Sequence, residues 1–225
     1  MIQHWTLHSK KLLNILHRLS EGGLLSGTSG NVSMCLRRDR MGGLILITPS
    51  QRLYQSLKEE DLVLVDFEGV VIRGDLKPSS EIDVHLEIYK KRYDVNAVIH
   101  THSTYASILA VGTMGLVPIL DELLIKTGGE VKIAEYGLPG TLDLANKLVS
   151  GLNDRNAVLM KNHGMVGVGN TLEDAFQICD LVERSSEVLV ASSLSGDLNL
   201  VPSIGVDFES EIYRKRFNLL SNIGI

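Results

Sequence analysis

Ala97-Val98-Ile99-His100-Thr101-His102 is typical of a buried β-strand that ends in two histidines. Side chains two residues apart on a strand project from the same face, so His100 and His102 point the same way. In the next segment, Ser103 to Val111, the apolar residues have the spacing of a helix. The stretch therefore predicts a strand followed by a helix, with two imidazoles side by side where the strand ends.

A third histidine follows another apolar strand-like run, in Leu159-Met160-Lys161-Asn162-His163-Gly164. Three neutral imidazole nitrogens suit a divalent ion such as zinc and leave one coordination position open for substrate or water. An open position is typical of a catalytic site rather than a structural one. The alternative for His163 alone is a hydrogen-bonded core residue. We assign no ligand role to the remaining histidines, which follow helical patterns: His4, His8, His17 and His85.

Composition limits the classes of protein to be considered. The 225 residues are enough for one domain with a sizeable core, 44% are hydrophobic and 22% are charged. A net charge of −5 argues against a nucleic-acid partner, which needs a clustered basic face. Two cysteines, Cys35 and Cys179, are too few for a disulfide scaffold, and no long apolar run predicts a membrane span. We therefore expect a cytoplasmic protein.

Hydrophobic periodicity predicts helices and strands that alternate along the chain. Several predicted strands are joined by tight turns, as at 37–41 and Glu68-Gly69, so a mixed sheet covered by helices is favoured over a purely parallel one. Thr171 is expected to cap the long helix that follows it. The predicted helices are 6–19, 79–93, 103–111, 141–151, 171–193 and 209–220, and the predicted strands are 31–35, 43–48, 62–67, 70–72, 96–100, 157–161 and 165–169.

Two polar segments have the composition of anion-binding loops. Gly27-Thr28-Ser29-Gly30-Asn31 offers glycines that let backbone amides approach an anion, although a tight turn explains the same cluster. In Pro78-Ser79-Ser80-Glu81 the serines stand where a helix begins, which favours a phosphate; simple N-capping by Ser79 or Ser80 is the alternative. We expect burial to raise the pKa of Glu81, which would let this carboxyl group shuttle a proton.

Five short motifs in a fixed order connect these observations. The motifs are GTSGNVS at 27–33, ITPS at 47–50, PSSE at 78–81, HTHS at 100–103 and NHG at 162–164. Together they resemble the class II sugar-phosphate aldolase and adducin-head family, and within it most the L-fuculose-1-phosphate aldolase branch. The resemblance runs from about residue 8 to residue 195. It implies an α/β fold of three layers, α-β-α, with a central mixed, largely antiparallel sheet, and a single domain over residues 1–225.

The resemblance also implies a function and its residues. A zinc ion, one per subunit, would be held by His100, His102 and His163, although another divalent metal is possible, and Glu81 would be the catalytic acid/base. Phosphate would be bound by Gly30, Asn31, Ser50, Ser79 and Ser80. The chain would cleave a ketose 1-phosphate to dihydroxyacetone phosphate and a short aldehyde through a metal-stabilised enediolate. A homotetramer with sites between subunits is implied as well, and a small sugar phosphate is the expected partner.

Two other functions stay open at this point. One is dehydration of a methylthioribulose-1-phosphate-type substrate by the same metal and glutamate, and the other is a non-catalytic interaction module of the adducin-head type. The chain also departs from the family pattern. Gln51 follows ITPS where a phosphate-approaching glycine is usual, and Glu122 stands where the fuculose enzymes have a tyrosine proton donor. The second proton donor is therefore unassigned, with Glu122 and Tyr213 as candidates.

Overall fold

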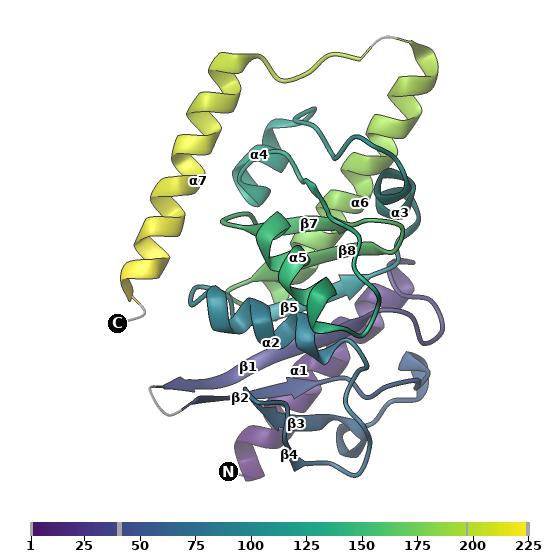
Figure 1. The fold of residues 1–225 in the computed structure, drawn as a ribbon, viewed down its shortest axis with the longest axis vertical. Helices are drawn as coiled ribbons and strands as arrows, with labels where there is room; N and C mark the ends of the chain where they lie inside the picture. The colour runs from purple at the N-terminus through teal and green to yellow at the C-terminus, as the bar shows by residue number, and fades with distance from the viewer. Residues whose placement is uncertain (1, 40–41, 197, 224–225) are drawn as a thin grey trace.

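The computed structural model describes residues 2–39, 42–196 and 198–223, and its strands form one eight-stranded sheet (Figure 1). The strands run in the order β4-β3-β2-β1-β5-β8-β7-β6. Every neighbouring pair is antiparallel except β6 and β7, which are parallel. Their bounds are β1 Asn31–Asp39, β2 Gly42–Ile47, β3 Val63–Asp66, β4 Val71–Arg73, β5 Ala97–Thr101, β6 Ile133–Ala134, β7 Ala157–Met160 and β8 Gly164–Gly169.

Helices cover both faces of the sheet. α1, α3 and α6 pack against one face, and α2 and α5 lie against the other (Figure 1). The predicted three-layer arrangement with a mixed, largely antiparallel sheet is confirmed. The helices are α1 Ile2–Glu21, α2 Ile82–Lys91, α3 Thr104–Val111, α4 Asp121–Thr127, α5 Leu142–Leu152, α6 Leu172–Ser195 and α7 Ser203–Ile223, with short 3-10 turns at Tyr54–Ser56 and Glu59–Asp61.

Alternation along the central strand β5 fixes which face each side chain joins. Ala97 and Ile99 belong to the core under α1 and α6, whereas Val98 belongs to the core under α2 and α5. By the same period of two, His100 projects toward α2. The strand therefore places one histidine on the α2 side of the sheet, beside the start of that helix.

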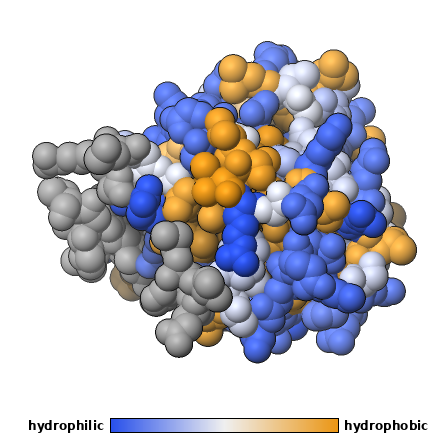
Figure 2. Space-filling model, turned by 90° about the horizontal axis from the view of Figure 1, so that it is seen from below, coloured by the Kyte–Doolittle hydropathy of each residue, from blue (hydrophilic) through white to orange (hydrophobic). Residues whose placement is uncertain are grey.

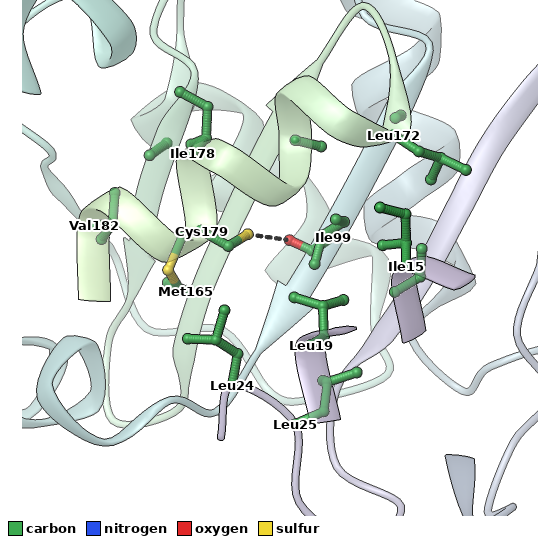
Figure 3. Close-up of a cluster of buried hydrophobic side chains, with 14 of the residues drawn as sticks. Ile15, Leu19, Leu24, Leu25, Ile99, Met165, Leu172, Ile178, Cys179 and Val182 are labelled. Atoms are coloured by element: carbon green, nitrogen blue, oxygen red, sulfur yellow. Dashed lines mark hydrogen bonds between the residues drawn. The ribbon is translucent and has the colours of Figure 1, made fainter. Parts of the chain in front are cut away.

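The core under α1 and α6 is apolar and closely interdigitated. In Figure 3, side chains from α1 and the loop after it meet those of α6 over β5 and β8. Cys179 lies within this core, where its thiol points to the backbone oxygen of Ile99 at 3.9 Å (Figure 3). Cys35 and Cys179 are both free. The core thus fixes β5 between two helix layers and makes its end a firm support for the histidines.

Most predicted helices and strands are present, with shifted ends. Thr171 caps α6 as expected, in a capping box with Asp174. The helix predicted over 79–93 begins three residues later, at Ile82, because the Ser79 hydroxyl accepts a hydrogen bond from the backbone N–H of Glu81 in a turn before the helix. Neither serine is therefore the N-cap. β1 continues to Asp39 through the predicted turn at 37–41, of which residues 40 and 41 lie outside the described residues.

Large apolar side chains are exposed at several places on the surface. Figure 2 shows a hydrophobic area near the centre of the face seen from below, with hydrophilic side chains beside it. The short edge strand β4 exposes Val71 and Ile72, and α7 exposes Ile204 and Phe208. Among the described residues, no helix combines the length and the apolar character that crossing a membrane would require.

Candidate metal centre

The antiparallel pairing of β5 with β8 brings the three histidines together. Thr101 pairs with Met165, so the turn that joins β7 to β8 lies directly beside the end of β5. Asn162 occupies the left-handed region in this turn, with φ 58°, and His163 follows it. A Cβ atom on Gly164 would lie 2.3 Å from the backbone oxygen of Thr101, so this close approach requires glycine.

The imidazole rings of His100, His102 and His163 form a compact trio. Their centroids are 4.7, 4.9 and 4.8 Å apart, and one nitrogen from each ring lies within 4.8 Å of the others. The Nε2 atoms of His100 and His102 are 2.9 Å apart. His100 is buried, His163 is half-buried and His102 is exposed. The trio is therefore open to solvent on the side of His102.

Glu81 reaches the same point from the start of α2, where it occupies the N-cap position. Its Oε2 atom lies 3.2 Å from Nε2 of His100, and its Oε1 atom lies 3.4 Å from Nε2 of His163. Oε2 also accepts a hydrogen bond of 3.0 Å from the side-chain amide of Asn31. Oε1 is buried and accepts no hydrogen bond from the described residues. One carboxylate oxygen is thus anchored, and the other is free.

The pKa of Glu81 corrects the expectation from the sequence. Burial does raise it, but hydrogen bonding to His100, the charges of His100 and His163 and the Asn31 amide outweigh burial, and the pKa falls to about 2. Burial, with the charges of the other two rings, lowers the pKa of His102 to about 4. Burial likewise lowers the pKa of His163. At neutral pH the carboxylate of Glu81 is therefore ionised, and the imidazoles of His102 and His163 are neutral.

These donors fit a divalent cation. Nδ1 of His100 donates to the backbone oxygen of Met165 at 2.8 Å, so Nε2 carries the lone pair that points to the other rings. Ligand atoms about 2.0–2.1 Å from a tetrahedral metal lie roughly 3.3 Å from one another. The 2.9 Å between the Nε2 atoms of His100 and His102 is close to that spacing, and nitrogens of all three rings lie within 4.8 Å of one another. The histidines could hold the metal, with Glu81 adjacent to it.

The segments with the predicted phosphate-binding residues lie next to one another beside this trio. A bridge between Pro49 and Pro78 joins ITPS to PSSE, and the Ser79 N–H donates to the Thr48 oxygen. Thr48 in turn pairs with Val32 in β1, adjacent to Gly30 and Asn31. Ser79 is buried, Ser80 is exposed, and Ser50 and Gly30 are half-buried. Because Asn31 hydrogen bonds to Glu81 and Ser80 precedes it in sequence, the fold brings the segments that hold all five residues close to Glu81.

Gly30 and Gln51 both have a backbone conformation with positive φ. Gly30 has φ +85°, and a Cβ atom there would lie 2.5 Å from the backbone oxygen of His100, so only glycine fits. Gln51 has φ 55°, the left-handed conformation that glycine adopts most easily. The departure from the family pattern at Gln51 therefore keeps the backbone geometry of a glycine while adding an exposed side chain.

The two candidates for a second proton donor lie elsewhere in the same chain. Glu122 is exposed in the first turn of α4. Tyr213 is buried in α7, and its hydroxyl donates to the backbone oxygen of Asp154, in the turn before β7. His163 follows the other end of β7, so Tyr213 and the histidines lie at opposite ends of that strand.

Two residues near the histidines were missed by sequence reasoning. His85, which was given no ligand role, is fully buried one turn after Glu81 and hydrogen bonds to Asn31 and Ser33. Its i, i+4 spacing from Glu81 was the available signal. Glu183 in α6 accepts hydrogen bonds from the first N–H groups of α3, just after His102, and no sequence pattern links these two segments.

Known proteins resemble the chain in sequence and in structure. The sequence pattern of the class II aldolase and adducin N-terminal domain family matches residues 10–190. A 5-deoxy-D-ribulose 1-phosphate aldolase from Bacillus thuringiensis serovar kurstaki is 37% identical over 201 residues, 89% of this chain and 90% of that protein. An L-fuculose phosphate aldolase from Methanococcus vannielii is 36% identical over 181 residues, 80% of this chain and 93% of that protein.

A solved structure shares the fold over nearly its whole length. An L-fuculose 1-phosphate aldolase superposes with a TM-score of 0.85 at 33% identity, covering 92% of this chain and 95% of that one. This superposition extends the match in sequence to the three-dimensional arrangement. The chain belongs to the family of class II aldolases and adducin N-terminal domains.

Proposed function

We propose that the chain is a metal-dependent aldolase that cleaves a ketose 1-phosphate to dihydroxyacetone phosphate and a short aldehyde. The observation that carries the proposal is the position of Glu81, with each carboxylate oxygen 3.2–3.4 Å from an imidazole Nε2 of the histidine trio. A non-catalytic module would have no use for an ionised carboxylate held beside three imidazoles, because its burial is costly.

His100, His102 and His163 are proposed to hold the cation, with zinc as the preferred metal. When bound there, a divalent cation supplies Lewis-acid stabilisation of the negative charge that develops on the carbonyl oxygen of the ketose. The open side at the exposed His102 is where the substrate would enter.

Glu81 is proposed to move the proton at C3 of the three-carbon product. In the direction of condensation its low pKa keeps it ionised, so it can accept the C3 proton of dihydroxyacetone phosphate. In the direction of cleavage the C3–C4 bond breaks as a base that we leave unassigned takes the C4 hydroxyl proton. Glu81 takes up a proton from that base or from water and transfers it to C3, so the site ends in the protonation state in which it began. Oε1 is the oxygen suited to this role, because Oε2 is anchored by Asn31.

The phosphate is proposed to bind among Gly30, Asn31, Ser50, Ser79 and Ser80. The backbone N–H groups of Ser50 and Ser79 are already paired with Lys77 and Thr48. The serine hydroxyls are therefore the expected donors, together with the start of α2, whose dipole favours an anion.

The names of the relatives suggest which ketose phosphates to test. Aldolases for 5-deoxyribulose 1-phosphate and for L-fuculose 1-phosphate are both among them, and a relative from Rhodospirillum rubrum is named for 5-methylthioribulose 1-phosphate as well. All three substrates share the C1 phosphate and the C2 carbonyl and differ beyond C4. We propose this class of substrate, with the aldehyde portion to be decided by assay.

We also propose a homotetramer with sites at subunit interfaces, a single domain over residues 1–225 and a cytoplasmic location. In Figure 1, α7 extends along one side of the molecule. Its exposed Ile204 and Phe208, together with Leu194 of α6, are apolar side chains that a neighbouring subunit could cover. Light scattering of the purified protein tests the tetramer directly.

A coupled assay for dihydroxyacetone phosphate tests the activity. The three ketose phosphates are supplied in turn, with the metal-loaded protein and with protein treated with a chelator. We expect cleavage of at least one, lost with chelator and restored by Zn²⁺, and a large loss of turnover in Glu81→Gln with metal retained. Formation of a dehydrated diketone instead would support the dehydratase, and full turnover by Glu81→Gln would contradict the role of Glu81.

A further inference from the structure

A line of buried polar side chains leads from Glu81 into the core between α2 and β1. Glu81, His85 and Tyr89 are four residues apart along α2, so they share one face of the helix. Asn31 and Ser33 are two residues apart on β1 and face them. The hydrogen bonds alternate between helix and strand, from Tyr89 to Ser33, His85, Asn31 and Glu81.

The contacts in this line are short and shielded from water. Ser33 Oγ lies 2.8 Å from the Tyr89 hydroxyl and 2.7 Å from Nδ1 of His85, and Nε2 of His85 hydrogen bonds to Oδ1 of Asn31. Asn31 is 4% exposed, and the other three are fully buried. An apolar core would need none of these groups, and each would be costly if left unpaired.

The carboxylate fixes the direction of every hydrogen bond in the line. An ionised Glu81 can only accept, so Asn31 must present its NH₂ group to it and its Oδ1 to His85. Nε2 of His85 therefore carries the hydrogen and donates to Oδ1. In the neutral ring Nδ1 must then accept, so the Ser33 hydroxyl donates to it and accepts from Tyr89.

We propose that Asn31, His85, Ser33 and Tyr89 are positioning residues that orient the carboxylate of Glu81 through a one-directional chain of donors. The inference rests on the proposed function of Glu81. The chain holds Oε2 and leaves Oε1 directed to His163 for the reacting proton. It also assigns the tautomer of His85, neutral with hydrogen on Nε2, a property that does not depend on activity.

The first experiment measures that tautomer in metal-free protein. Long-range ¹H–¹⁵N correlation at pH 7.5 of ¹⁵N-labelled protein reports which ring nitrogen carries hydrogen, and His85→Gln identifies the signal by its loss. We expect a neutral ring protonated at Nε2. Hydrogen on Nδ1, or a charged ring, would overturn the proposal whether or not the protein proves to be an aldolase.

The second experiment compares two substitutions of His85 in metal-loaded enzyme. Leu has a similar size but cannot donate to Asn31, whereas the amide of Gln can. We expect His85→Leu to lower kcat about tenfold or more with KM within about twofold, and His85→Gln to recover most of kcat. A role in folding alone predicts that kcat per folded molecule is unchanged in both. Undiminished kcat in folded His85→Leu would overturn the positioning role.

Discussion

His85→Gln is expected to reduce the acid sensitivity of the metal-free protein. Burial, with a smaller effect of the charge on His100, lowers the pKa of His85 from 6.5 to about 3. In the unfolded chain His85 binds a proton below pH 6.5, whereas in the folded chain it binds one only below about pH 3. The free energy of unfolding therefore decreases as pH falls through that window. Between pH 7 and pH 5 His85 alone lowers the free energy of unfolding by about 2 kcal/mol, because each pH unit below 6.5 lowers it by about 1.4 kcal/mol.

Urea unfolding of chelator-treated protein at pH 7 and pH 5 measures this difference. The lowered pKa values of His102 and His163 contribute to the wild-type loss as well. The quantity of interest is therefore the pH-dependent loss of stability in wild type minus that in His85→Gln. His17→Gln, on the exposed face of α1, controls for the loss of a histidine as such. We expect a difference of about 2 kcal/mol for His85. Equal losses in wild type and His85→Gln would refute the argument from burial.

Three further substitutions test the supports of the site, each by urea unfolding. Gly164→Ala places a Cβ atom 2.3 Å from the Thr101 oxygen, so we expect a loss of about 1–3 kcal/mol and weaker Zn²⁺ binding; unchanged stability would contradict the close approach. Glu183→Gln removes a carboxylate that accepts two N–H groups of α3 and should cost about 1 kcal/mol, whereas the exposed Glu187→Gln should cost less than about 0.5 kcal/mol. For Gln51→Gly, relief of the left-handed φ should offset the added entropy of the unfolded chain, so we expect stability within about 1 kcal/mol of wild type; a larger loss of stability would count against strain there.

Much of the fold could be predicted because its strongest patterns are local. Short apolar runs identified the central strands, which are buried throughout, and Thr171 with Asp174 marked the start of α6. α4 and β6 were missed because they are short, at seven and two residues, and depend on tertiary contacts rather than on their own periodicity. The start of α2 was misplaced because the Ser79 hydroxyl forms a turn before the helix instead of capping it.

The candidate site was likewise predictable where it depends on local sequence and not where it depends on tertiary contacts. The His-x-His spacing at the end of a strand sufficed to predict that His100 and His102 point together, but only the pairing of β5 with β8 brings His163 to them. The pKa of Glu81 was predicted with the wrong sign. The sequence indicated its burial, but not the Asn31 amide and the two imidazoles, which favour the charged form more strongly than burial disfavours it.

Calorimetric titration of metal-free protein with Zn²⁺ tests most directly whether the three imidazoles act together. We expect one ion bound per chain in wild type and in His17→Ala. In His102→Ala and His163→Ala, which each remove one of the converging nitrogens, we expect binding at least tenfold weaker, as for loss of a direct ligand. Wild-type affinity in both of these variants would contradict a metal centre built on this trio.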